Sequence, residues 1–188
     1  MSQDFLSEEY LSYDFSFNFQ KILMEKAIHE AKKAFLKEEI PIGAVFYFPM
    51  EKKCFAFHNE TKNQENPLYH GEFLAIHKSL EEKMGPYLSH GVLYVTLQPC
   101  IFCQEAIKKT RISQVYFGAY QYEKPFFSEN CYGHNHMLSS DHTERTSHGY
   151  FKTQGQKNFP GTIFSGGFYE STCRELLQKF FQNKRLKN

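Results

Sequence analysis

The chain has 188 residues, of which 41% are hydrophobic and 23% are charged, and this composition suits one globular domain with a sizeable core. Its 22 lysine and arginine residues nearly balance 21 aspartate and glutamate residues, which leaves a formal net charge of +1. This balance excludes a strongly basic nucleic-acid coat protein and a self-repelling disordered chain, although it permits a local basic patch.

The start of the chain predicts neither a secretory signal nor a membrane segment. Residues 1–18 are rich in aromatic and acidic residues without a long period, so we expect a loosely ordered N-terminal arm. No lysine or arginine precedes Lys21, whereas a secretory signal begins with positive charge. No apolar run approaches the roughly 18 residues that a membrane span needs. We therefore expect a cytoplasmic protein.

Hydrophobic periods of about four and two residues predict the elements that follow. Helices are expected at residues 19–36, 71–80, 99–110 and 170–185. Strands are expected at residues 41–48, 53–58, 91–97, 112–118 and 162–168. Asn18 is expected to cap the first helix, and Pro99 is expected to occupy the first position of the third.

The order of these elements predicts an α/β fold in which helices pack on both faces of one sheet. Strands joined through helices should run parallel, whereas the first two strands should form an antiparallel hairpin. Residues 119–160 interrupt the alternation and show no sustained period. Loops beyond roughly 15 residues are uncommon inside compact domains, so this segment is interpreted as an insertion in a domain that spans residues 19–188.

The cysteines predict a metal site rather than disulfides. Their number is odd and the chain is long enough to fold without crosslinks, so no disulfide framework is expected. The five are Cys54, Cys100, Cys103, Cys131 and Cys173. Residues three apart on a helix face one way, and the first turn of a helix favours thiolates, so Cys100 and Cys103 can bind a metal together.

A second motif, His70-Gly71-Glu72, also opens a predicted helix. His70 can supply a third ligand, and two sulfurs with one imidazole give a zinc site with one open position, as in catalytic centres. Zinc lowers the pKa of a water in that position from about 15.7 to about 7. Glu72 is poorly placed as a fourth ligand, but it can take a proton from this water and pass it to a leaving group. The combination suits hydrolytic attack on a carbon that carries an amino group.

The two motifs together match H-x-E…P-C-x-x-C, the signature of the zinc deaminases. Within that superfamily the chain resembles the tRNA-specific adenosine deaminases, which make inosine at the anticodon wobble position. The resemblance covers roughly residues 20–119 and 161–185. The stretches that carry it are Pro41–Val45, Gly91–Cys103, Val115–Ala119, and Cys173–Leu177 with Phe180-Phe181.

This resemblance implies a three-layer α/β/α, cytidine-deaminase-like fold with a mixed five-stranded sheet. It implies that Glu72 is the acid/base in attack on C6 of adenine, next to a zinc ion on His70, Cys100 and Cys103. It also implies a homodimer that takes its target base from a tRNA anticodon stem-loop. The residues expected to contact the substrate are Ile42, Asn59, Gly71 (through its backbone), Pro99 and Phe181.

The chain departs from this family at several positions, and these departures bear more on RNA binding than on zinc chemistry. Gly71 replaces the usual Ala, Gln98 stands where Glu is common, and Gln182 stands where the family has Arg. The segment at 119–160 replaces a charged, glycine-containing loop in the region where relatives contact RNA.

Other functions share part of this pattern. A deaminase of a free base or nucleoside (guanine, cytosine or cytidine) would keep the zinc site without RNA affinity; the near-zero net charge favours it, and the C-terminal helix disfavours it. A non-catalytic RNA-binding subunit would be expected to lack Glu72. A redox pair or a structural zinc half-site would explain Cys100 and Cys103, but not the accompanying His70.

Two further groups of residues, the histidines of the insertion and a set of basic residues, can be explained either by ordinary surface structure or by a function. Four histidines crowd the insertion, where no spacing repeats a ligand pattern and a polar loop is expected; they are His134, His136, His142 and His148. Basic residues either line an RNA path, with Phe180 or Phe181 stacking a base, or form solvated helix faces. They are Lys108, Lys109, Arg111, Lys179, Lys184, Arg185 and Lys187.

Overall fold

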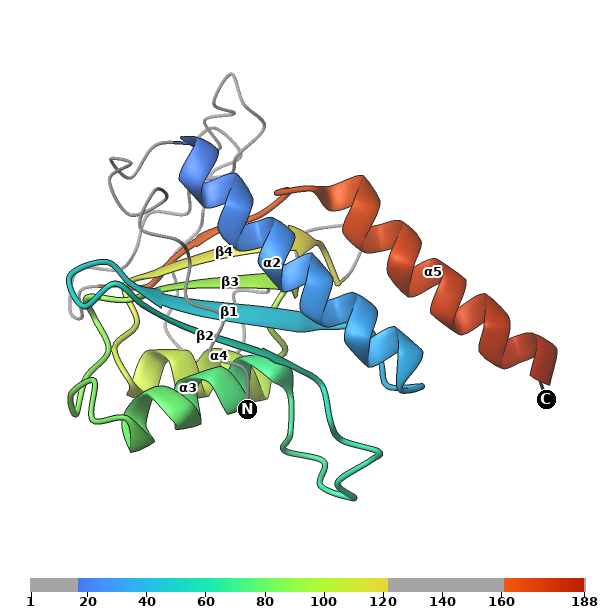
Figure 1. Ribbon diagram of the computed structural model, residues 1–188, viewed down its shortest axis with the longest axis horizontal. Helices are drawn as coiled ribbons and strands as arrows, with labels where there is room; N and C mark the ends of the chain where they lie inside the picture. Colours follow the sequence, from blue (N-terminus) through green and yellow to red (C-terminus); the bar gives the residue numbers. More distant parts are fainter. Residues whose placement is uncertain (1–16, 122–160, 188) are drawn as a thin grey trace, which may run out of the picture.

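The computed structural model describes residues 17–121 and 161–187 (Figure 1). Nearly all of the expected N-terminal arm and of the 119–160 insertion, with its four histidines and Cys131, lies outside the described residues. The helices are α2 (Phe17–Leu36), α3 (Gly71–Glu81), α4 (Ile101–Lys109) and α5 (Glu170–Lys187). The strands are β1 (Gly43–Phe48), β2 (Lys53–His58), β3 (Val92–Leu97), β4 (Gln114–Ala119) and β5 (Ile163–Ser165).

The strands form one five-stranded sheet in the order β2-β1-β3-β4-β5. β1 is antiparallel to both β2 and β3, whereas β3–β4 and β4–β5 are parallel pairs. Because β1 opposes both of its neighbours, β2 and β3 run in the same direction, as expected for strands joined through a helix. The mixed five-stranded sheet is therefore confirmed.

Helices cover both faces of this sheet, with α2 and α5 on one side and α3 and α4 on the other (Figure 1). The core beneath α3 and α4 is centred on Phe46, Phe48 and Ile107, and the core beneath α2 on Leu23 and Tyr94. All six residues of β1 are buried, which explains why this strand reads as a continuous apolar run. The three-layer α/β/α architecture is confirmed.

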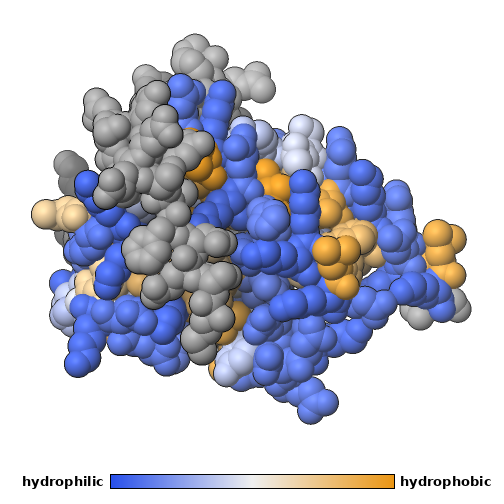
Figure 2. All heavy atoms as spheres, in the orientation of Figure 1, coloured by the Kyte–Doolittle hydropathy of each residue, from blue (hydrophilic) through white to orange (hydrophobic). Residues whose placement is uncertain are grey.

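The surface fits the near-neutral, polar composition. On the face seen in Figure 2, hydrophilic residues cover most of the described surface, and apolar residues form only separate patches. None of the described helices combines the length and the apolar character that a membrane crossing requires. The four cysteines of the described ranges are free thiols.

Three local expectations were wrong. α2 begins at Phe17, so Asn18 lies inside its first turn and is not the N-cap. α4 begins at Ile101, after Pro99, because the extended backbone of Cys100 (ψ 168°) makes that residue the N-cap. β5 ends at Ser165, because Gly167 takes a φ of +89° that a strand does not accommodate.

Candidate metal centre and substrate pocket

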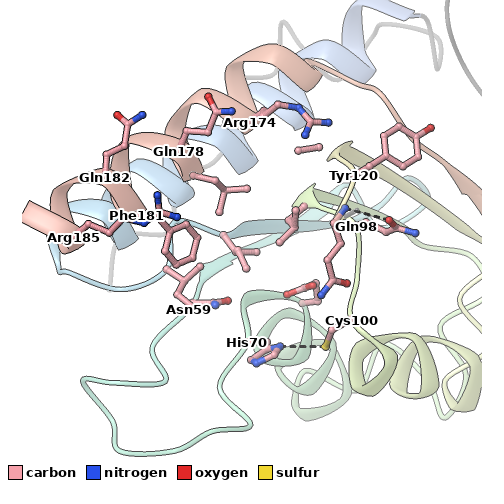
Figure 3. A pocket seen from close by; sticks show the side chains of 17 residues that line it. Asn59, His70, Gln98, Cys100, Tyr120, Arg174, Gln178, Phe181, Gln182 and Arg185 are labelled. Carbon is pink, nitrogen blue, oxygen red and sulfur yellow. Dashed lines mark hydrogen bonds between the residues drawn. The ribbon is translucent and has the colours of Figure 1, made fainter. Parts of the chain in front are cut away.

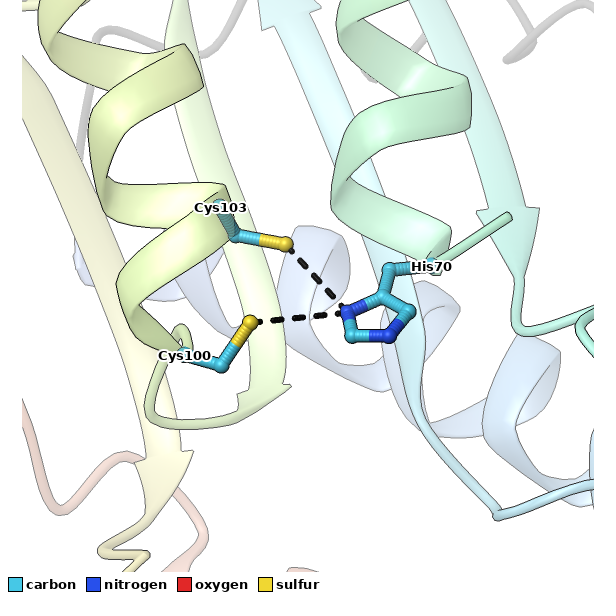
Figure 4. Close-up of side chains that lie close together, drawn as sticks. All are labelled: His70, Cys100 and Cys103. Carbon is cyan, nitrogen blue, oxygen red and sulfur yellow. Dashed lines mark hydrogen bonds between the residues drawn. The ribbon is translucent and has the colours of Figure 1, made fainter. Parts of the chain in front are cut away.

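The N-terminal ends of α3 and α4 bring His70, Cys100 and Cys103 together (Figure 4). His70 and Cys100 are the N-caps of the two helices, and Cys103 lies one turn into α4. Nδ1 of His70 lies 3.6 Å from Sγ of Cys100 and 3.5 Å from Sγ of Cys103. The three potential ligand atoms all lie within 4.8 Å of one another. Two thiols and one imidazole at this spacing fit Zn²⁺, whose ligands converge on a point about 2 Å from each.

The two thiols differ in their readiness to ionise. A hydrogen bond from the Cys103 thiol lowers the pKa of Cys100 to about 4, although partial burial acts in the opposite direction. The pKa of Cys103 is raised, because the sulfur of Cys100 and burial both disfavour a second negative charge. The pair therefore holds one negative charge readily, and a bound divalent cation is what would favour two thiolates.

Glu72 lies beside this group with a carboxylate suited to proton transfer. It is the second residue of α3 and is only 3% exposed. Burial raises the pKa of Glu72 to about 7. Among the residues that the structure describes, its buried Oε2 atom has no hydrogen-bond partner, so it is open to a ligand at this position. A carboxyl group with a pKa near 7 can accept and release a proton at neutral pH.

A cavity of about 670 Å³ opens above the metal centre (Figure 3). His70, Glu72 and Cys100 lie at its base. α5 supplies the opposite wall, with residues that recur every three or four positions and so share one helix face. These residues are Arg174, Leu177, Gln178, Phe181, Gln182 and Arg185. The volume falls within the range of small-molecule and cofactor sites.

Three of the five residues expected to contact the substrate line this cavity: Ile42, Asn59 and Phe181. Gly71 and Pro99 are not among the lining residues, and their backbones make contacts beside it. The N–H of Gly71 donates to Oδ1 of Asn59 at 2.9 Å. The carbonyl of Pro99 accepts a hydrogen bond from Nε2 of Gln104 at 2.8 Å.

The loop between Asn59 and His70 is held by a buried carboxylate on the α2–β1 connection. Glu39 is 1% exposed, and its Oε1 accepts hydrogen bonds from the N–H groups of Lys62 at 2.8 Å and Asn63 at 2.7 Å. Backbone N–H groups that converge on one carboxylate oxygen fix the course of a loop. Glu39 therefore fixes the course of the segment that connects Asn59 to His70, a candidate metal ligand.

Sequence reasoning missed most of the α5 wall and the structural position of Gln98. Phe180 and Phe181 are neighbours, but Phe180 is buried and packs on Phe35, whereas Phe181 is 44% exposed and faces the cavity. The sequence signal that could have located this wall is the spacing of Arg174, Gln178 and Arg185, which places them on one polar side of the helix. Gln98 is buried, and its Oε1 accepts a hydrogen bond from the N–H of Gln121 at 3.3 Å.

Comparison with known proteins identifies a matching family and a similar protein of known activity. Residues 18–119 match the family model described as the cytidine and deoxycytidylate deaminase zinc-binding region. A tRNA-specific adenosine deaminase of Buchnera aphidicola subsp. Baizongia pistaciae is 32% identical over 165 residues, which cover 88% of this chain and 90% of that protein.

Two solved structures extend this comparison. One, from a study of A-to-I editing by tRNA:A34 deaminases at the wobble position of transfer RNA, is 33% identical with a TM-score of 0.50 over 54% of this chain and 77% of that chain. A guanine deaminase from Nitrosomonas europaea is 14% identical with a TM-score of 0.61 over 85% of this chain and 83% of that chain. The second likeness covers more of the chain, but at this identity it shows the fold alone.

Proposed function

The chain belongs to the cytidine and deoxycytidylate deaminase zinc-binding family, and on this premise we propose that it converts adenosine to inosine at the wobble position of tRNA anticodons. The observation that carries the proposal is the juxtaposition of His70, Cys100 and Cys103 with the buried carboxylate of Glu72 at the base of a cavity. The near full-length likeness to a tRNA-specific adenosine deaminase supports the choice of adenosine in tRNA.

The chemistry divides between the metal and the chain's own side chains. Zinc held by His70, Cys100 and Cys103 supplies a Lewis acid that makes a water acidic enough to act as nucleophile at neutral pH. Glu72 accepts one proton of the attacking water at its unpartnered Oε2. It then delivers that proton to the amino group on C6, so that ammonia leaves. The second proton of the water passes to N1, and the oxygen of the water remains as the carbonyl of inosine. Water and adenosine are consumed, and inosine and ammonia are formed.

The cavity wall supplies groups that suit an extruded nucleotide. The target base must leave the anticodon stack to reach Glu72. In this proposal Asn59 hydrogen-bonds the base through its amide, and the exposed ring of Phe181 stacks on a neighbouring base. Arg185 lies on the same face of α5, where it can pair with a phosphate. An exposed aromatic ring and a basic side chain on this wall suit a nucleotide within RNA better than a free base, which has no phosphate.

We also propose a homodimer in the cytoplasm. Apolar side chains stand exposed on and just before α3 and α4: Ile101, which follows Cys100, is 63% exposed, Leu68 46%, and Leu80, near the end of α3, 38%. Such side chains are better covered by a partner chain than left in water. Light scattering of the purified protein tests the dimer, and a mass of one chain at all concentrations would contradict it.

We further propose that residues 19–188 form one deaminase domain, with residues 1–18 as an arm and residues 119–160 as an insertion. The family match spans only the first part of this domain, and α5 completes the cavity from the other side of the insertion. Limited proteolysis with mass spectrometry tests this organisation. Cleavage confined to these two segments would support it.

The decisive experiment offers the zinc-loaded protein total tRNA together with adenosine, guanine, cytosine and cytidine. Mass spectrometry of the products should find inosine at the wobble position and unchanged free bases and nucleosides. RNA binding should also weaken with salt, since each phosphate contact adds roughly 0.7–0.9 to the log–log slope. Product from a free base, with untouched tRNA, would contradict the proposal and favour the small-molecule alternative.

A further inference from the structure

A buried hydrogen-bonded pair, His58 and Glu30, lies behind the cavity wall that carries Asn59. His58, the last residue of β2, is 9% exposed, and Glu30, on α2, is 7% exposed. Nδ1 of His58 lies 2.8 Å from Oε2 of Glu30. Neither residue lines the cavity, so the proposed chemistry leaves this pair without a function.

The pair exists because α2 approaches the sheet unusually closely at Gly43. A Cβ atom on Gly43 would overlap the carbonyl oxygen of Ala27 and lie 2.9 Å from the Cβ of Glu30. Gly43 and His58 are partners in the register of β1 and β2. The missing side chain at Gly43 therefore lets the helix set the Glu30 carboxylate against the ring of His58.

Both ring nitrogens of His58 are engaged. Nε2 lies 3.0 Å from Nζ of Lys37, and a lysine ammonium group can only donate, so Nε2 accepts. The ring proton then sits on Nδ1 and is donated to Glu30. Lys33 donates a second hydrogen bond to the other oxygen of Glu30 at 2.7 Å. The ring cannot turn without leaving a buried carboxylate short of a partner.

This fixed ring belongs to the residue directly before Asn59. The N–H of Asn59 donates to the carbonyl of Ile42 at 3.0 Å, and its Oδ1 accepts from the N–H of Gly71. A Cβ on Gly71 would lie 3.3 Å from the Cα of His58, so the backbone of His58 packs under the first residue of α3. Any shift of His58 would therefore be transmitted to Asn59 and to the start of α3.

We infer that Glu30 and His58 are positioning residues of the substrate cavity. They hold the end of β2 so that the side chain of Asn59 faces the cavity beside His70 and Glu72, as Figure 3 shows for Asn59 and His70. They act through Asn59 and contact neither the base nor the metal. The inference rests on the proposed function, because it requires Asn59 to contact the base.

A double-mutant cycle tests it with an anticodon stem-loop RNA as substrate. Glu30→Ala should lower kcat/KM about tenfold in the wild-type background, a coupling of ordinary size for linked residues. In the Asn59→Ala background the same change should have almost no effect, because the residue through which it acts is gone. Glu30→Gln, which keeps an oxygen that accepts the Nδ1 proton, should restore most of kcat/KM. Zinc content should stay unchanged in every variant.

A matched control separates positioning from loss of stability. Ile112 is fully buried before β4, away from the cavity-lining residues, and Ile112→Val lowers stability without touching Asn59. Its small effect on kcat/KM should be the same in both backgrounds. Thermal melts of all variants define the temperature at which each is fully folded, and the assays are run below it.

Two results would overturn the inference. One is an equal loss of kcat/KM from Glu30→Ala with and without Asn59. The other is a lower melting temperature with unchanged kcat/KM, which would give the pair a purely structural role. A wild-type protein that leaves the stem-loop untouched but deaminates a free base overturns the proposed function instead, and the same cycle is then run with that base.

Discussion

The N–H of Gly71 and Oδ1 of Asn59 form a 2.9 Å hydrogen bond that joins the cavity wall to the first residue of α3. A backbone N–H can only donate, so the amide atom that it meets must be the oxygen of Asn59. The NH₂ group of Asn59 is therefore the part left to face a substrate. The bond gives this side chain one orientation, in which the proposed contact with the base would be a hydrogen bond donated by Asn59.

Asn59→Asp tests that orientation. The carboxylate of the variant still accepts the Gly71 N–H, so the fold and the zinc content should not change. It has no NH₂ group to donate, and kcat/KM for the stem-loop should fall on the order of tenfold to a hundredfold. Steady-state kinetics with mass spectrometry of inosine measures this. Equal activity of wild type and variant would show that Asn59 does not donate to the base.

Replacement of Glu72 by Ala should abolish turnover and leave the metal in place. The carboxylate is buried, its Oε2 has no partner within residues 17–121 and 161–187, and it is not one of the three grouped candidate metal ligands. General acid–base groups commonly contribute a factor of about 10²–10⁴ to rate. Elemental analysis should find zinc in the variant at the wild-type ratio. Normal turnover by this variant would contradict the proposed mechanism.

Removal of zinc should lower both activity and thermal stability. A metal that binds only the folded chain stabilises it by about 4 kcal/mol at a thousandfold excess over its dissociation constant. A chelator should therefore lower the melting temperature, and added zinc should restore it. Cys103→Ser should lose the metal, whereas Cys173→Ser, also buried but outside the ligand group, should keep it. Equal zinc loss from both cysteine variants would contradict the assignment.

Glu30→Gln should lower the free energy of unfolding by roughly 1–3 kcal/mol at pH 7. Burial alone would raise the pKa of Glu30, but hydrogen bonds from His58 and Lys33 lower it from the ordinary 4.5 to about 2. A carboxyl with a lowered pKa stabilises the fold above pH 4.5 and loses that contribution as the pH falls toward 2. The difference between wild type and variant should therefore shrink over this interval in urea titrations.

Glu38→Gln is the matched control for that experiment. Hydrogen bonds from Lys187 and Lys62 also lower the pKa of Glu38 to about 2, but its side chain is 58% exposed. Solvent screens exposed ion pairs, so this variant should change stability very little at any pH. If Glu30→Gln and Glu38→Gln lowered the free energy of unfolding equally, burial would not strengthen the interaction of Glu30 with His58 and Lys33.

Gly43→Ala should destabilise the fold by roughly 1–3 kcal/mol, because the added methyl group must push α2 away from the sheet. The new Cβ would lie 2.5 Å from the backbone nitrogen of Ala31, and backbone cannot move aside cheaply. Gly71→Ala is the control, since its Cβ would lie no closer than 3.3 Å to a neighbour. In urea denaturation, the free energy of unfolding of Gly43→Ala should be well below that of Gly71→Ala. The reverse order would contradict the close approach of α2 to Gly43.

The grouping of His70, Cys100 and Cys103 could be predicted because its parts are local in sequence. His70 and Cys100 each stand at the start of a helix, and Cys103 follows one turn later. β2 and β3, which lead into these two helices, run in the same direction and so deliver both helix starts to one edge of the sheet. Residue type, spacing and strand direction were therefore sufficient for this part.

The cavity wall and the Glu30–His58 pair were not open to prediction in the same way. Phe180 and Phe181 are identical neighbours, and only the docking of α5 decides which one is buried and which faces the cavity. The distance between Glu30 and His58 depends on how closely α2 approaches Gly43. Periodicity specifies which face of a helix is apolar, but it does not specify the helix's distance from the sheet or its rotation.

The position of α5 in the sequence determines the order in which the parts of the site are completed during synthesis. The three candidate metal ligands lie between residues 70 and 103, whereas the wall opposite them comes from residues 174–185. Because the chain is synthesised from its N- to its C-terminus, the candidate ligands leave the ribosome well before the residues of the wall. Metal can therefore bind before the cavity is complete, because the cavity also requires that α5 has left the exit tunnel.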